Sequence, residues 1–144
     1  MKVSVGLWLL PFLIWSASVI GKSLDSSFAD YLRDAGFFPK GSVSLTVRSL
    51  AVAEGVTALA LLWPKGRRVG WFLTVGLASA FLLIHGLSLA VGDTLPCGCF
   101  GLWVHFDARW SHALMGLLCL SLIACSWLGV MGATQLSPKS EKVE

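Results

Sequence analysis

Long apolar stretches alternate with short polar segments along the whole chain. Three of the four stretches contain no Asp, Glu, Lys or Arg, and the second contains only Arg48 and Glu54. Each is long enough, at about 1.5 Å of helix per residue, to cross a hydrocarbon core about 30 Å thick. Continuous runs of this length favour helices, because barrel strands alternate apolar and polar positions over about 10 residues. The sequence therefore predicts an all-α fold, an integral membrane four-helix bundle. The predicted spans are residues 3–21, 43–63, 69–91 and 111–131.

The first stretch has a second interpretation. Lys2, the apolar run after it and the small residues around Ala17 are similar to a secretory signal peptide. The run is longer than the usual apolar core of about 7–15 residues, and no clear Ala-x-Ala cleavage site follows it. We expect the segment to be retained, which gives a transmembrane domain over residues 1–132 and a polar tail over residues 133–144.

The amino-acid composition supports membrane insertion and limits the classes of partner that the protein can bind. Of the 144 residues, 56% are hydrophobic and 13% are charged, whereas soluble domains average about 45–50% and about 25%. The net charge of +3 comes from scattered Lys and Arg, with no basic run interleaved with aromatics. We therefore expect a lipid bilayer as partner and no nucleic acid.

Charge in the short connections predicts the orientation. Segment 64–69 contains Lys65, Arg67 and Arg68 but no acidic residue, which favours the cytoplasmic side. Both termini then lie in the cytoplasm, and segments 22–42 and 92–110 lie outside. We expect a multi-pass protein of the inner (plasma) membrane.

The first outer segment has the spacing of a short amphipathic helix. Ser23 or Asp25 is available to cap its start, and Gly36 followed by Pro39 would end it. We expect this helix to lie on the extracytoplasmic membrane surface. Its apolar positions are Leu24, Phe28, Tyr31, Leu32 and Ala35.

The sharpest chemical feature is Cys97-Gly98-Cys99, in the predicted outer connection after the third span. A disulfide across one residue closes a very small ring and needs a sharp bend, which Gly98 permits. Such a strained bond is comparatively easy to reduce, as labile and catalytic disulfides are. The extracytoplasmic side is also where disulfides persist. Cys97 and Cys99 are therefore candidate catalytic thiols.

Two other interpretations of this pair stay open. The cysteines could belong to an unreactive turn, or they could bind Cu(I) or Zn(II), which thiolates suit as ligands. His105 or His112 could complete a metal site, but zinc normally takes four ligands and the chain has no second paired motif. We therefore assign no metal ligand.

Polar residues inside the predicted spans need an explanation, because a charge at the bilayer centre costs at least about 2.5 kcal/mol. Glu54 should face the bundle interior, with His85 as its nearest plausible partner. That pair could relay protons released by thiol oxidation or only hold the helices together. Arg48 could reach the outer interface, where it would lower the pKa of a nearby thiol.

Two further cysteines lie in the fourth span. Cys119 and Cys125 are six residues apart, which places them on different helix faces, so we do not expect them to pair. The expected role of each is that of a small buried hydrophobic residue.

The order of these motifs resembles the methylamine utilisation protein MauE and its DoxX-like relatives, which are small four-helix membrane proteins. Gly21-Lys22 followed by Phe28 is similar to that family's first helix end and surface segment. Glu54-Gly55 is similar to its intramembrane Glu-Gly step. The stretch from Cys97 to Gly101 is similar to its Cys-Gly-Cys-Phe-Gly loop.

The resemblance implies a role in maturation or transport of an exported disulfide-rich protein, such as the methylamine dehydrogenase small subunit. It places Cys97 and Cys99 in the thiol role and Glu54 in the membrane interior. The partner would be that client or a thioredoxin-like protein. The bundle is also similar to membrane enzymes that oxidise thiols with quinone, which makes quinone a possible cofactor.

We therefore expect the Cys97 and Cys99 pair to exchange disulfides through a mixed disulfide. Two other functions stay open. A transport protein would pass a soft metal ion from the two thiols towards Glu54 and His85. A non-catalytic assembly factor would hold an exported partner through its outer loops.

Overall fold

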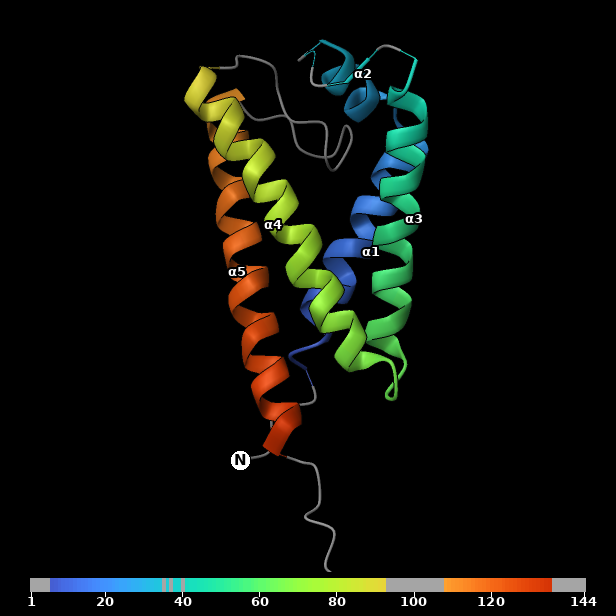
Figure 1. The fold of residues 1–144 in the computed structure, drawn as a ribbon, viewed down its shortest axis with the longest axis vertical. Coiled ribbons are helices and arrows are strands. Elements are labelled where there is room, and N and C mark those ends of the chain that lie inside the picture. Colours follow the sequence, from blue (N-terminus) through green and yellow to red (C-terminus); the bar gives the residue numbers. More distant parts are fainter. Residues whose placement is uncertain (1–5, 35, 37, 40, 93–107, 136–144) are drawn as a thin grey trace, which may run out of the picture.

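The computed structural model describes residues 6–34, 36, 38–39, 41–92 and 108–135. Within these residues every regular element is an α-helix, which confirms the all-α fold class. Figure 1 shows the helices in chain order from blue to red. They are α1 (Leu9–Leu24), α2 (Ser27–Asp34), α3 (Val43–Leu62), α4 (Arg67–Val91) and α5 (Ala108–Gln135).

Three of the described helices are long and apolar enough to cross a membrane. They are α3, α4 and the part of α5 from Trp110 to Met131, with mean hydropathies of 1.6, 1.9 and 2.2. Only 22–28% of the residues in these windows are buried inside the protein, so apolar side chains cover much of the outer surface. Such a surface indicates a lipid bilayer environment.

Helix α1 is also apolar, but its 16 described residues are fewer than those of the other three. It begins at Leu9, after a turn over residues 6–8, and continues through Lys22 to Leu24. Residues 3–5 of the predicted first span lie outside the described residues. The helix thus carries a lysine that the sequence pattern had assigned to the following connection.

The four long helices form two pairs. Helix α5 packs along α4 and α3 packs along α1, while α3 and α4 also contact each other. Helices α3 and α4 approach most closely near the turn that joins them and draw apart towards the end where α2 lies (Figure 1). At the close end a Cβ on Gly70 would stand 2.9 Å from the Leu61 nitrogen, so a glycine allows this approach.

Helix α2 is amphipathic as predicted, and its apolar face packs into the protein. Phe28, Tyr31 and Leu32 are each at most 3% exposed. Asp25 supports the start of the helix, because its carboxylate accepts hydrogen bonds from the Ser27 amide (3.1 Å) and hydroxyl (2.7 Å). The position of α2 at the membrane surface stays a prediction, and its three apolar side chains form part of the protein interior.

Leu24 was also predicted for that face and does not contribute to it. Leu24 ends α1 and is 73% exposed, and Ala35 lies outside the described residues. Past the helix, Gly36 has a φ of +69°, a left-handed conformation that glycine adopts without strain. This agrees with the predicted end of the helix.

The contact between Trp71 and Gly129 gives a test of the α4–α5 packing. A Cβ on Gly129 would stand 2.5 Å from the Trp71 ring, so we expect Gly129→Ala to destabilise the protein by about 1–3 kcal/mol through overpacking. Thermal unfolding in detergent measures the change. Gly76→Ala is the matched control, because no heavy atom lies within 4 Å of its added Cβ. Equal unfolding temperatures for the two variants would contradict this packing.

Candidate functional site

The most deeply buried charges of the described chain form an ion pair between α1 and α3. The Lys22 Nζ lies 2.8 Å from the Glu54 Oε1 and 3.2 Å from its Oε2, and both side chains are 0% exposed. The same ammonium donates to the Ser18 hydroxyl at 2.6 Å, one helical turn earlier in α1. A charge-assisted bond to both carboxylate oxygens is what allows two opposite charges to stay buried.

Aromatic rings from two other helices surround the ammonium. The Lys22 Nζ lies 4.8 Å from the ring centroid of Phe28 in α2 and 5.2 Å from that of Phe81 in α4. Both distances are within the range of cation–π attraction, which is stronger where water is excluded. The lysine therefore contacts groups from four helices, α1 to α4.

A pair of histidines joins α4 to α5. The Nδ1 atoms of His85 and His112 are 3.1 Å apart, and the two residues are 1% and 0% exposed. A hydrogen bond between two imidazole nitrogens requires that one carries the proton and the other accepts it. The Nδ1 of one ring is therefore protonated, and the Nδ1 of the other ring is not.

Tyr31 of α2 contacts the histidine pair, and Phe81 of α4 contacts both the histidine pair and the ion pair. The Tyr31 hydroxyl is 2.6 Å from the Ser88 hydroxyl of α4, and its ring centroid is 5.8 Å from that of His112. The Phe81 ring lies over His85, with centroids 6.4 Å apart, and also contacts the Lys22 ammonium. All five helices thus contribute to one group, Lys22, Tyr31, Glu54, His85 and His112, which we call the polar cluster.

The expected pair of Glu54 and His85 is wrong. Both residues are buried, but Glu54 bonds to Lys22 and His85 bonds to His112. Lys22 was missed because it directly follows the apolar run and was counted with the charges of the outer segment. A signal for it exists in the sequence, since Ser18 and Lys22 are four residues apart and share a helix face.

The remaining predicted site residues are placed as follows. Arg48 is exposed on α3. Cys97, Gly98 and Cys99 lie outside the described residues, so the geometry of this pair and its approach to Arg48 stay predictions. The prediction that Cys119 and Cys125 do not pair is confirmed, because Cys125 is a free thiol.

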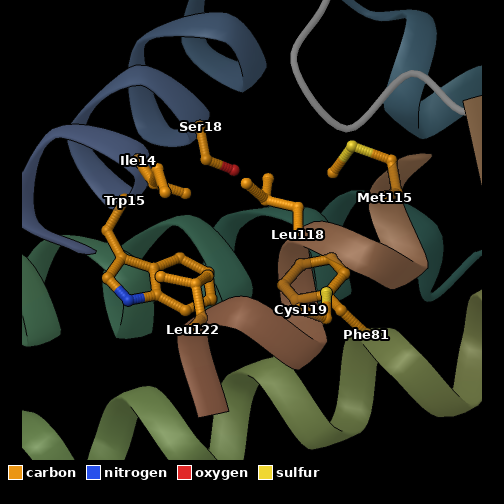
Figure 2. A pocket seen from close by; sticks show the side chains of 8 residues that line it. All are labelled: Ile14, Trp15, Ser18, Phe81, Met115, Leu118, Cys119 and Leu122. Carbon is orange, nitrogen blue, oxygen red and sulfur yellow. The ribbon is translucent and has the colours of Figure 1, made fainter. Parts of the chain in front are cut away.

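Cys119 is 3% exposed and lines a small pocket between α1, α4 and α5, with a cavity volume of about 20 Å³. Figure 2 shows its thiol beside Phe81, with Trp15 and Ser18 on the opposite side, where α1 forms the wall. The lining is almost entirely apolar, and its polar group Ser18 is bonded to Lys22. The pocket therefore adjoins the polar cluster at the ion pair.

The structure speaks against Glu54 as a metal ligand. The Lys22 ammonium already bonds both carboxylate oxygens, and its positive charge would repel a cation. Among the described residues there is no group of three or more His, Cys, Asp or Glu that could hold a metal ion. Within the polar cluster, the two imidazoles and the Tyr31 hydroxyl are groups that can both donate and accept hydrogen bonds.

Comparison with known proteins identifies the family of this sequence. A family model described as methylamine utilisation protein MauE matches residues 2–131. The match covers the polar cluster and the Cys97-Gly98-Cys99 motif, and it confirms the resemblance found in the sequence. No curated protein and no solved structure matches the chain.

The buried ion pair predicts a non-additive effect on stability. We expect Lys22→Met or Glu54→Leu alone to destabilise the protein by about 3–5 kcal/mol, because each leaves one charge buried without its partner. Combining Lys22→Met with Glu54→Leu removes both charges and should recover most of that loss. Thermal unfolding in detergent measures all three variants. A double variant that loses the sum of the two single effects would contradict a strong pair.

Proposed function

This chain belongs to the methylamine utilisation protein MauE family, and from that membership we propose that it supports thiol-disulfide-linked maturation or transport of an exported protein. The client we propose is the one that the resemblance implies, the methylamine dehydrogenase small subunit, and the family description itself names only methylamine utilisation. The single observation that carries the proposal is a family match that includes the Cys97-Gly98-Cys99 motif. Family and apolar helices together make it a membrane protein of methylamine utilisation.

The described helices support this role by the way they flank the motif. Helix α4 ends at Val91, and Gly92 closes it in a left-handed conformation with φ +74°, where its amide bonds to carbonyls of the last turn. Helix α5 begins at Ala108. His85 and His112 bond to each other close to these two ends. The two helices that flank the cysteine motif are therefore bonded to each other near the motif.

The reaction we propose is thiol-disulfide exchange. The thiolate of Cys97 or Cys99 attacks one sulfur of a client disulfide, and the other client sulfur leaves as a thiolate. The second cysteine then attacks the mixed disulfide, which releases a client dithiol and leaves a Cys97–Cys99 disulfide. The reverse sequence oxidises the client, and a thioredoxin-like partner would reset the pair in either direction.

We further propose that the protein lies in the inner membrane with its termini and the α3–α4 turn in the cytoplasm. Lys65, Arg67 and Arg68 cluster at this turn, as the positive-inside rule requires. The Arg67 guanidinium lies 4.8 Å from the Trp8 ring, so the basic turn and the start of α1 occupy the same end of the bundle. Helix α2 lies at the opposite end (Figure 1), which is the extracytoplasmic end in this orientation.

The thiol role predicts a complete loss of function when both motif cysteines are replaced. We expect Cys97→Ser with Cys99→Ser to abolish formation of correctly disulfide-bonded client, measured by thiol alkylation and mass spectrometry of the exported protein. Cys125→Ser is the control and should retain maturation, because that thiol lies outside the motif on α5. Normal client disulfides in the double variant would remove the redox role. If the double variant still captures the client but leaves it unoxidised, binding and chemistry are separate.

The proposed orientation predicts labelling from opposite sides. In intact cells a membrane-impermeant maleimide should reach Cys97 and Cys99 after reduction. It should not reach a thiol introduced by Lys65→Cys in the Cys97→Ser, Cys99→Ser background. Permeabilising the membrane should then expose position 65, because its side chain is on the protein surface. Labelling of position 65 in intact cells would reverse the orientation.

A further inference from the structure

The turn between α3 and α4 presents two cations that no described acidic side chain neutralises. Lys65 and Arg68 are exposed, and neither forms an ion pair within the described part of the chain. Three of the described acidic residues lie in or directly before α2, at the opposite end of the bundle (Figure 1). The fourth, Glu54, is bonded to Lys22. The positive charge at this turn therefore remains available to a partner outside the protein.

The backbone of the turn is held in place by bonds within the protein. The Gly66 amide donates a hydrogen bond to the Trp63 carbonyl at 2.9 Å. The Arg67 Nε donates to the Leu61 carbonyl at 3.2 Å, and its guanidinium lies 4.8 Å from the Trp8 ring. The middle one of the three cations is thus engaged with the protein itself. The two cations that flank it project from a fixed backbone.

Exposed apolar side chains border these two cations. Trp63, Val69 and Phe72 are 67%, 58% and 55% exposed. Arg68 and Phe72 are four residues apart, which places them on the same face of α4. Helical side chains tilt towards the start of their helix, so Arg68 is directed away from the apolar surface that begins at Val69. A charged group followed by apolar surface matches the order of a phospholipid, from its phosphate to its acyl chains.

We propose that Lys65 and Arg68 bind the phosphate of an anionic phospholipid whose acyl chains lie along Val69 and Phe72. A guanidinium can bond two phosphate oxygens at once, and an ammonium adds a compact positive charge. Basic residues directly beside a membrane-spanning helix attract anionic lipids. A lipid is favoured over a dissolved anion because the apolar run of α4 starts immediately after Arg68. The two cations therefore lie at the level of the lipid headgroups.

The test counts lipids bound to the purified full-length protein by native mass spectrometry in a neutral detergent. Phosphatidylglycerol, which is anionic, and phosphatidylcholine, which has no net charge, are titrated with identical acyl chains. We expect the first phosphatidylglycerol to bind more tightly than the first phosphatidylcholine. Equal affinities for the two lipids would overturn the proposed site. Because a detergent micelle has no sides, the result does not depend on the orientation of the protein in the cell.

Charge-removing variants locate the site on the protein. Lys65→Gln and Arg68→Gln should each weaken phosphatidylglycerol binding about fivefold, and the double variant roughly 25-fold. Lys65→Arg keeps the charge and should keep the affinity. Arg33→Gln is the matched control, because it removes one exposed arginine from α2 at the other end. Full affinity in the double variant, or a loss in Arg33→Gln equal to that in Arg68→Gln, would overturn the site. Thermal unfolding should be unchanged in all of them, since these side chains are exposed.

Two further conditions distinguish a lipid from a dissolved anion. Inorganic phosphate at the concentration of the lipid should not displace phosphatidylglycerol, because it has no acyl chains to lie along α4. Displacement at that concentration would show a site for free anions and would contradict the proposal. Raising the salt from about 0.1 M to about 1 M shortens the Debye length from about 10 Å to about 3 Å. It should weaken phosphatidylglycerol binding more than phosphatidylcholine binding, and equal effects on both would speak against a charge-based site.

Discussion

The buried ion pair between Lys22 and Glu54 determines how the other helices are arranged. A single charge in a hydrocarbon environment costs several kcal/mol, and with no water available each charge needs its partner in the protein. The two are held 2.8 Å apart from different helices, which fixes α1 against α3 in both rotation and height. Phe28 of α2 and Phe81 of α4 are held against this pair, because their ring faces attract the ammonium.

This requirement also explains the position of α2. A helix of eight residues with a strongly polar outer side would gain little by itself. Here Phe28 contacts Lys22, and Tyr31 bonds to Ser88 across the widened end of the bundle. The apolar face of α2 is therefore part of the protein interior. It covers the polar cluster at the end where α3 and α4 draw apart (Figure 1).

The sequence predicted the helices well because lipid imposes a simple rule on them. A long apolar run that crosses lipid must be helical throughout. Accordingly, α3 ends one residue before its predicted bound, and α4 begins two residues before its predicted bound. Helix α5 extends beyond the predicted 111–131 at both ends, because backbone hydrogen bonding continues past the apolar run. Such a rule says nothing of how each helix is rotated.

The partners inside the bundle depend on rotation and relative height, so they could not be predicted. Glu54 was correctly expected to be buried, but the nearest histidine by count along the spans is not its partner. Lys22 was out of consideration, since a lysine at the end of an apolar run usually extends its charge to the interface. The burial of its ammonium becomes evident only when Phe28 and Phe81 are seen to surround it.

The difference between the expected and the observed pairing changes the chemistry of the interior. A Glu54–His85 pair would bind the imidazolium strongly and hold its proton in place. Because Lys22 neutralises Glu54 in the observed structure, the carboxylate does not hold an imidazolium in this way. His85 instead bonds to His112, where one imidazole nitrogen donates and the other accepts. The ion pair thus joins α1 to α3, and the separate histidine pair joins α4 to α5.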